Sequence, residues 1–279
     1  MMRPSNSRPD RARAARRGDG FTLLEMAVVL FIVGMLTAGL IGPVQTQLEA
    51  RDRHATRDYL GQAVEALYGF AITQRRLPCP DTDGDGRANP PYSVPVDGQC
   101  DADVGFLPWA ELGVEPADAW GNRVTYRVRQ PEFTVPAQNS ACDGDTANEF
   151  DLCARGNIDI ETRGDNTATA GAEAKFLYPA ASAENVVAVL VSHGRNGYGA
   201  VRADGANGIT PTPVPSADRD EQENADGDAV FVSRGYTRGD NGCADDTDEG
   251  SSLCEFDDLV LPVSRALLMG RMVQAGQLP

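Results

Sequence analysis

The chain has 279 residues, of which 25 are basic and 41 acidic, with a formal net charge of −16 at pH 7. Six arginines and two aspartates lie in the first 20 residues, so the rest carries 19 basic and 39 acidic side chains and a formal charge of −20. Because binding of nucleic-acid phosphates requires a basic surface, we expect no nucleic-acid partner, whereas divalent cations or basic partners fit this charge.

The first predicted element is an apolar helix at residues 21–44. Residues 26–44 contain no charged side chain, and a helix of that length reaches about 28 Å, close to the thickness of a bilayer core. Arginines precede this segment and acids dominate after it, which predicts a single-pass membrane protein with a cytoplasmic N-terminus and its head in the periplasm or outside the cell. Glu25 lies near the start of the segment, where a carboxylate is costly in lipid unless it finds a cation.

The residues from Gly20 to Leu36, GFTLLEMAVVLFIVGML, resemble the prepilin segment of type IV pilins and type II secretion pseudopilins. The resemblance implies that residues 1–20 are a leader, that prepilin peptidase cuts between Gly20 and Phe21, and that the new amine of Phe21 is methylated. It also implies that Glu25 pairs with the N-terminal amine of a neighbouring subunit. A leader of 20 residues with Asp19 before the cut departs from the commonest short ones. A secretory signal peptide, a twin-arginine signal and a plain bitopic anchor are the alternatives.

The helix is expected to continue as an amphipathic half at residues 45–76. Its apolar positions recur at helical spacing, and Pro78 and Pro80 end the pattern. Gly42 and Pro43 predict a kink between the two halves. Because an apolar stripe needs cover, this half should pack on a sheet. The stripe consists of Leu60, Ala63, Val64, Leu67 and Ala71.

The head at residues 77–279 is predicted to be acidic and of the α+β class. Strands are expected at residues 123–128, 185–192 and 229–233, with long polar loops at 163–172 and 202–227. Residues 257–277 combine a short strand with an amphipathic tail. The expected fold is pilin-like: a long N-terminal helix packed on a small antiparallel sheet, with long loops stapled by disulfides.

Two segments of the head extend the resemblance. DAWGNRVTYRV at residues 118–128 is similar to a segment of major type II secretion pseudopilins, and VSHGRNGYG at 191–199 is similar to the turn that follows it there. RLPCPDTDGDG, GFLPWAELGV and FDDLV resemble segments of minor-pilin-like proteins. Since the loops are much longer than in the small major subunit, the resemblance implies a minor or specialised subunit that binds other pilin or pseudopilin subunits through its N-terminal helix.

All six cysteines follow the predicted membrane helix. An even number in an oxidising compartment favours disulfides, and sequential pairing is the simplest of the 15 connectivities that six cysteines allow. Zinc is the rival interpretation, but the chain has no CxxC pair and only His54 and His193. The sequential pairs are Cys79 with Cys100, Cys142 with Cys153, and Cys243 with Cys254.

Asp81, Asp83 and Asp85, followed by Gly86, match the first half of a calcium-binding loop. Tyr92 stands where such a loop places its bidentate glutamate. Oxygens from Asp97, Asp101 or Asp103 are expected to complete the site, because a disulfide between Cys79 and Cys100 would bring that end of the loop back. The alternative is an acidic turn in solvent.

A second acidic cluster is the alternative calcium site. It combines Asn224, Asp226 and Asp228 with Asp257 and Asp258, and related pseudopilins bind calcium in their C-terminal loop region. Acids inside the two smaller cysteine loops are expected to be solvated. These acids are Asp143, Asp145, Asp245, Asp246 and Asp248.

The sequence gives little support for catalysis. Ser192 and His193 are adjacent, which is not the arrangement of a catalytic triad, and GxSxG, Walker and dinucleotide-binding motifs are absent. We therefore expect a non-enzymatic filament subunit. The alternatives are a bitopic envelope protein that does not polymerise and binds calcium or a ligand with its head, and a secreted hydrolase with a misleading leader.

Overall fold

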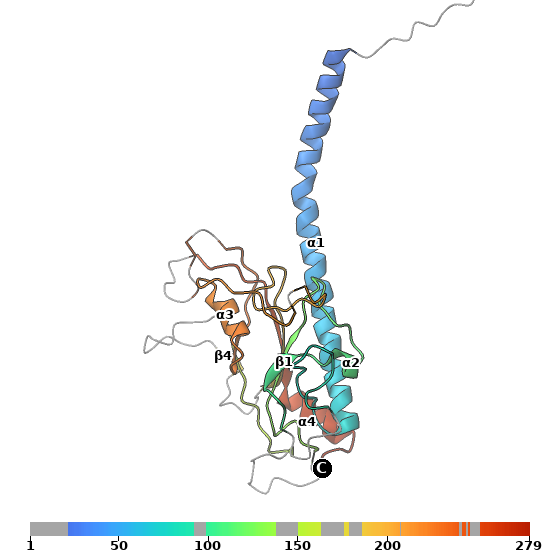
Figure 1. Cartoon of the computed structure of the whole chain (residues 1–279), viewed down its shortest axis with the longest axis vertical. Helices are drawn as coiled ribbons and strands as arrows, with labels where there is room; N and C mark the ends of the chain where they lie inside the picture. Colours follow the sequence, from blue (N-terminus) through green and yellow to red (C-terminus); the bar gives the residue numbers. More distant parts are fainter. Residues whose placement is uncertain are drawn as a thin grey trace, which may run out of the picture. The chain divides into compact units, whose positions relative to one another are not determined.

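The structure is a computed structural model, and it describes residues 22–91, 99–137, 150–162, 176–178, 186–206, 208–239, 242–243, 245 and 252–279 (Figure 1). The chain divides into two compact units, Met1–Glu49 and Ala50–Pro279. The predicted leader, Phe21 and Cys142 lie outside the described residues.

The long predicted helix is present as α1, Leu23–Gln74. It ends at Gln74, because the next residue, Arg75, has a positive φ of 61° that takes the backbone out of the helical region. The predicted apolar stripe is confirmed, because Leu60, Ala63, Leu67 and Ala71 are all buried. The side chains of residues 38–45 are outside the described part, so the kink at Gly42 and Pro43 stays a prediction.

Four antiparallel strands form the first sheet, in the order β1-β2-β5-β7. The predicted strands at 123–128 and 185–192 are confirmed as β2 and β5, and the strand expected after residue 257 is β7. Strand β1 was not predicted, because three residues are too few to show an alternating pattern. The bounds are β1 Val104–Phe106, β2 Thr125–Val128, β5 Val186–Ser192 and β7 Leu259–Ser264.

The prediction of one antiparallel sheet was incomplete, because a second sheet has the order β4-β3-β6. It consists of β3 (Asp159–Glu161), β4 (Phe176–Tyr178) and β6 (Val230–Val232), and β3 pairs with β6 in parallel. Strand β6 was expected at residues 229–233. Its parallel partner, β3, lies about 70 positions earlier in the chain, and a local sequence pattern does not predict a pairing over that distance.

The described part of the chain also contains three shorter helices: α2 (Trp109–Leu112), α3 (Arg219–Ala225) and α4 (Arg265–Gln274). Helix α4 is the predicted amphipathic tail, with Leu268 and Met272 buried and Leu267 and Val273 exposed. Helix α3 was predicted as loop, because its sequence RDEQENA offers no apolar stripe.

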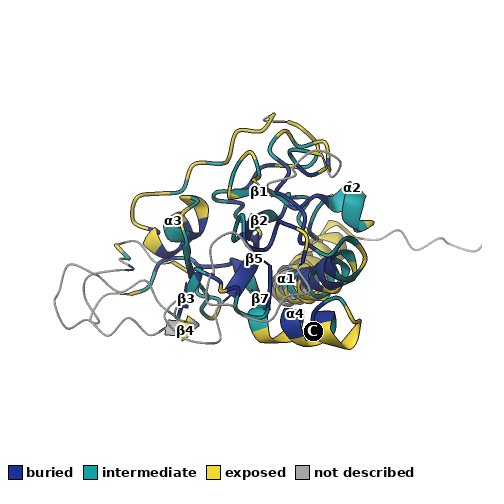
Figure 2. Cartoon of the chain, turned by 90° about the horizontal axis from the view of Figure 1, so that it is seen from below, coloured by how far each residue is buried: buried dark blue, intermediate teal, exposed yellow. Residues whose placement is uncertain are grey.

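Strand β5 lies at the centre of the head, and all seven of its residues are buried. Leu190 belongs to the core cluster that includes Leu67 of α1 and Leu268 of α4, whereas Val189 belongs to a second cluster with Ile160 and Phe231 of the second sheet. Figure 2 shows β5 between α1 and the β3–α3 layer. Because both faces of β5 are buried, its sequence is an almost unbroken run of apolar residues.

Two of the predicted disulfides are present in the described part of the chain. Cys79 is bonded to Cys100 with a Cα–Cα distance of 5.4 Å, and Cys243 is bonded to Cys254 at 4.9 Å. The third predicted pair involves Cys142, which is not among the described residues.

Candidate functional site

The first turn of α1 contains Glu25, the predicted assembly glutamate. The backbone N–H and the hydroxyl of Thr22 donate to Glu25 Oε2 at 3.2 and 3.3 Å, and the backbone N–H of Glu25 donates to Thr22 Oγ1 at 3.2 Å. This reciprocal pairing is a capping box, which satisfies free donors at a helix N-terminus. Glu25 is exposed, so its carboxylate is accessible to a further cation. Gly20 and Phe21 lie outside the described residues.

The apolar side chains before and after Glu25 are exposed. Leu23 is 93 % exposed and Phe31 is 72 % exposed, and the large apolar residues between them and up to Leu36 are also exposed. A continuous apolar surface of this kind marks contact with another protein or with lipid. Within the part of the chain that is described, no helix is both long enough and apolar enough to cross a membrane.

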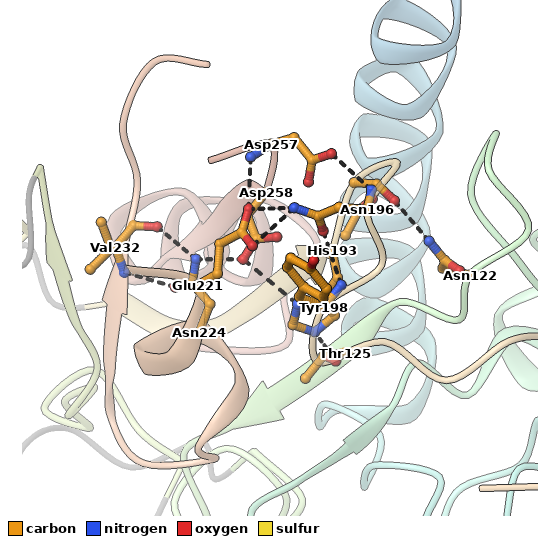
Figure 3. A network of polar contacts seen from close by, with 12 residues as sticks. Asn122, Thr125, His193, Asn196, Tyr198, Glu221, Asn224, Val232, Asp257 and Asp258 are labelled. Carbon is orange, nitrogen blue, oxygen red and sulfur yellow. Dashed lines mark hydrogen bonds and ion pairs between the residues drawn. The ribbon is translucent and has the colours of Figure 1, made fainter. Parts of the chain in front are cut away.

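The second unit contains a group of three carboxylates that we call the buried acid cluster: Glu221 of α3, and Asp257 and Asp258 just before β7. One oxygen from each lies within 4.8 Å of the others (Figure 3). Their exposed fractions are 0, 1 and 3 %. Three carboxylates out of contact with water repel one another strongly unless protons or a cation neutralise them.

Asn196 holds two members of the cluster together. Its side-chain amide donates to both oxygens of Glu221 at 3.0 Å, and its backbone N–H donates to Asp257 Oδ2 at 3.0 Å. The backbone N–H of Asp257 in turn donates to Glu221 Oε1 at 3.0 Å. Since Asn196 belongs to the turn after β5, three segments far apart in the sequence meet at this point.

Asp258 has a different set of neighbours. Its Oδ2 accepts a hydrogen bond from the Asn224 side chain at 2.8 Å and lies 3.6 Å from His193 Nδ1. Asn224 also exchanges hydrogen bonds with the backbone of Val232, which fixes α3 against β6. The positions of these partners depend on tertiary contacts rather than on a single loop.

The cluster leaves polar atoms without partners. Asp257 Oδ1, Asp258 Oδ1 and His193 Nδ1 are buried and have no hydrogen-bond partner among the described residues. Leaving a buried charged oxygen unsatisfied costs more than leaving a neutral one. A cation coordinated by both aspartates would remove this cost.

The pKa values of the cluster reflect the burial of its carboxyl groups and the repulsion between them. Burial raises the pKa of Glu221 to about 9, and the charge of Asp258 adds to the rise. Burial raises the pKa of Asp257 to about 7, with Asp258 again adding and the backbone N–H groups of Asn196 and Arg195 acting against it. At neutral pH the raised pKa values favour protonated carboxyls unless a cation neutralises the site.

Glycine is required where the turn after β5 approaches the cluster. Gly194 has a φ of 57°, and a Cβ there would lie 1.9 Å from Asp257 Oδ1. Gly199 has a φ of 80°, and a Cβ there would lie 2.6 Å from the Cβ of Ala225. The glycines in HGRNGYG thus allow the backbone to reach Asp257 and α3.

The sequence-predicted calcium loop forms a separate group of Asp81, Asp83 and Asp85, which also bring one oxygen each within 4.8 Å. Asp81 is buried, and its two oxygens accept hydrogen bonds from the backbone of Asp83, Gly84 and Gly86. Burial raises the pKa of Asp81, and these hydrogen bonds act against the rise. The turn is thus held by its own hydrogen bonds.

Asp101 and Asp103, two of the residues expected to complete that loop, do not belong to this group of carboxylates. Asp103 instead lies 3.4 Å from Arg127 and accepts a hydrogen bond from Gln130, and Tyr92 and Asp97 are outside the described residues. Asp83 and Asp85 are exposed. The turn with Asp81, Asp83 and Asp85 is therefore a weaker candidate for a cation site than the buried acid cluster.

The alternative cluster predicted from the sequence divides into two groups. Asp226 and Asp228 lie with Glu223, whereas Asp257 and Asp258 lie with Glu221. Asp226 and Asp228 are exposed and accept hydrogen bonds from the backbone of their own turn. Burial raises the pKa of Glu223 to about 7, with the charges of the two aspartates adding to the rise.

Asp245 was expected to be solvated, and this prediction was wrong. The residue is buried, and its Oδ1 accepts hydrogen bonds from Arg234 at 3.2 Å and from the backbone N–H of Cys254 at 2.8 Å. The buried guanidinium supplies the charge that makes burial possible. Asp143, Asp145, Asp246 and Asp248 lie outside the described residues.

The adjacent Ser192 and His193 have separate partners. Ser192 Oγ donates to Asp118 Oδ2 at 2.6 Å, whereas His193 Nε2 is 2.9 Å from Thr125 Oγ1. Ser192 is fully buried. A serine nucleophile needs a hydrogen bond to its base, and Ser192 donates to Asp118 rather than to His193.

Sequence reasoning missed Glu221 and Asn196. Glu221 belongs to a polar stretch in which many residues are acidic, so nothing in the local pattern marks it. Asn196 lies in a turn that was singled out, but its partners became visible only when β5, α3 and the segment before β7 came together.

The chain is similar to known proteins in two ways. Residues 16–41 match the prokaryotic N-terminal methylation motif. Over 139 residues, 49 % of this chain and 92 % of the relative, it is 26 % identical to the type II secretion system core protein G of Aeromonas hydrophila. No solved structure matches. Neither description names an enzymatic activity. The methylation motif and the secretion-protein relative together support a pilin or pseudopilin family for this chain.

Proposed function

We propose that this protein is a minor pilin or pseudopilin, a structural subunit of a type IV pilus or type II secretion filament. The observation that carries the proposal is the methylation motif at residues 16–41, with Glu25 in the first turn of α1 and exposed apolar side chains after it. Such a helix can bundle with the same helix of other subunits, because each would cover the apolar surface of its neighbours.

Maturation would create the N-terminal amine with which Glu25 of a neighbouring subunit pairs. Prepilin peptidase cleaves after Gly20, and methylation of Phe21 leaves a positively charged amine. In the single chain Glu25 is held by neutral donors of Thr22. An amine from a neighbouring subunit is a charged donor and binds a carboxylate more strongly than a neutral donor does. Glu25 would thus set the register between subunits.

The proposed location is the inner membrane, with residues 21–44 as a single span and the head in the periplasm. The arginines before the apolar segment and the acids after it support this orientation. The disulfides of the head also support it, because disulfides persist in oxidising compartments.

The size of the head favours a minor subunit. The aligned 139 residues are nearly all of the secretion-protein relative but only 49 % of this chain. About half of the chain therefore has no counterpart in that relative. A main filament subunit must repeat at close spacing, whereas a specialised subunit can carry a large head.

We further propose that the buried acid cluster binds calcium, a hard cation that prefers oxygen ligands. Glu221, Asp257 and Asp258 would provide carboxylate oxygens, and the unpartnered Asp257 Oδ1 and Asp258 Oδ1 support this choice. Asp81, Asp83 and Asp85 form the second candidate. The ion would supply the positive charge that lets the three buried carboxylates stay ionised.

Mass spectrometry of the mature protein, isolated from its own host, tests the assignment. We expect an N-terminus at Phe21 that carries one methyl group, and co-purification with other pilin-type subunits after cross-linking. A mature N-terminus elsewhere would refute the prepilin interpretation. A methylated Phe21 in a protein that never cross-links to other subunits would instead favour the non-polymerising envelope protein.

A further inference from the structure

The disulfide between Cys243 and Cys254 ends three residues before Asp257. Cys254 is completely buried, and its backbone is held on both sides: its N–H donates to Asp245 Oδ1 at 2.8 Å, and its carbonyl accepts from Thr237 Oγ1 at 2.7 Å. The segment that leads into the buried acid cluster is therefore anchored at Cys254.

Arg234 joins this anchor to α3. Its guanidinium donates to Asp220 through Nε, to Thr237 Oγ1 at 2.6 Å through one terminal nitrogen, and to Asp245 Oδ1 at 3.2 Å through the other. The same group lies over the ring of Phe256, 4.4 Å from its centre. Only a planar guanidinium can serve acceptors in these directions while it stacks on an aromatic ring.

These contacts hold both sides of the cluster. Asp220 immediately precedes Glu221, and Phe256 immediately precedes Asp257. Glu221 and Asp257 lie 36 positions apart, so their separation in space depends on such contacts. Arg234, Asp245 and the disulfide thus connect the backbone on which the acids of the cluster are placed.

We propose that the Cys243–Cys254 disulfide and Arg234 position the buried acid cluster, so that tight cation binding requires the oxidised disulfide. The inference rests on the proposed calcium site. A dithiol reductant would deliver two electrons and two protons, break the S–S bond to give two thiols, and close its own disulfide. Cys243 and Cys254 could then separate, and the disulfide would no longer hold Cys254 in place for its hydrogen bond to Asp245. The site would form only after transfer to an oxidising compartment.

The test measures calcium affinity on the purified full chain, kept in a mild detergent and titrated calorimetrically with calcium chloride. We expect Cys243→Ser with Cys254→Ser to weaken binding at least about 10-fold, the range typical of residues that orient metal ligands. The matched control is Cys79→Ser with Cys100→Ser, which removes the other described disulfide and should leave the affinity unchanged. Dithiothreitol should weaken binding in the wild type and in this control, but not further in the first variant.

A second pair of variants keeps every cysteine. Arg234→Lys retains the charge but cannot serve three acceptors, and should weaken calcium binding at least about 10-fold with the disulfide intact. Arg271→Lys is the matched control, because Arg271 also pairs with a carboxylate, Glu65, and stacks on an aromatic ring, Tyr68. If the double serine variant fails to give the near-ultraviolet circular dichroism of the folded chain, the arginine pair decides.

The outcomes separate the two proposals. Absence of calcium binding in the oxidised wild type would refute the calcium site and the inference with it. Binding of equal strength in the wild type, the Cys243→Ser, Cys254→Ser variant and Arg234→Lys would refute the inference alone. Weakening in the Cys79→Ser, Cys100→Ser variant only, or equally in both disulfide variants, would also refute it.

Discussion

The guanidinium of Arg53 in α1 donates a hydrogen bond to the backbone carbonyl of Asp257 at 3.2 Å, across 204 positions of the chain. The same group lies 4.1 Å from the centre of the Tyr236 ring. Through Arg53 the long helix therefore contacts the segment that carries two of the three buried acids. A shift of the Asp257 backbone would therefore alter this hydrogen bond to α1.

Replacement of Arg53 should destabilise the head. Arg53→Ala removes a hydrogen bond from a charged donor and a cation–π contact, and we expect a loss of about 1–2 kcal/mol in the free energy of unfolding because the side chain is partly exposed. Urea denaturation of the full chain measures it. The control Arg51→Ala alters an exposed arginine of the same helix and should change stability by less than about 0.5 kcal/mol. Equal effects of the two variants would show that the contact with Asp257 adds nothing.

Gly20 should be required for processing. Gly20→Val places a branched side chain at the residue before the proposed cut, where the resemblance implies that the peptidase accepts glycine. We expect uncleaved protein to accumulate in the membrane fraction, seen as a larger species on immunoblots. Gly18→Val, two residues earlier in the leader, is the control and should be cleaved normally. Normal cleavage of Gly20→Val would overturn the leader assignment.

Glu25 should be needed for assembly and not for insertion. Glu25→Leu makes the segment more apolar, so membrane association should persist or increase. Cross-linking to other pilin-type subunits should fall, because the amine of a neighbour loses its counter-charge. Glu49→Leu removes an acid further along α1 and should leave cross-linking unchanged. Undiminished cross-linking of Glu25→Leu would count against the pairing of charges.

Calcium should stabilise the chain through the buried acid cluster. The wild type should melt at a higher temperature in millimolar calcium than in chelator, with a gain of about 2.7 kcal/mol when free calcium is 100 times the dissociation constant. Asp257→Asn with Asp258→Asn should abolish most of this gain, because an amide carries no charge to offset the cation. Asp83→Ala with Asp85→Ala should retain it. The opposite result would place the ion at Asp81, Asp83 and Asp85.

Asp118 should make stability depend on pH. Burial raises the pKa of its carboxyl, while hydrogen bonds from Ser192, Asn122 and Trp120 act against the rise. The folded chain therefore keeps a proton that the unfolded chain has released between the unfolded pKa, about 3.9, and the raised folded pKa. The free energy of unfolding should fall as pH rises through this window, by up to about 1.4 kcal/mol per pH unit, and level off above it.

Asp118→Asn should remove that contribution, since the amide does not titrate. Unfolding free energies of the wild type and the variant, measured in chelator between pH 4 and pH 8, should differ most in slope at the acidic end, roughly from the unfolded pKa upward. Asp58→Asn, at an exposed position of α1, should follow the wild type. Parallel curves for the wild type and Asp118→Asn would contradict the prediction.

Local patterns were sufficient for several parts of this protein. The apolar segment with Glu25 predicted the methylation motif, and helical spacing predicted the buried stripe from Leu60 to Ala71. Runs of apolar and β-branched residues predicted β2, β5, β6 and β7, because the pattern of a strand is visible in consecutive residues. Two of the sequential cysteine pairs were also predicted, because short loops bring their ends together at little entropic cost.

The sequence by itself thus determined the elements whose residues repeat at a regular spacing and the segment that carries the methylation motif. Only the tertiary structure decided that Glu221 joins Asp257 and Asp258, that Asp245 is buried against Arg234, and that β3 pairs in parallel with β6. The physical reason is that burial and charge pairing depend on segments far apart in the chain. An acidic residue in a polar stretch looks the same in sequence whether water surrounds it or another strand covers it.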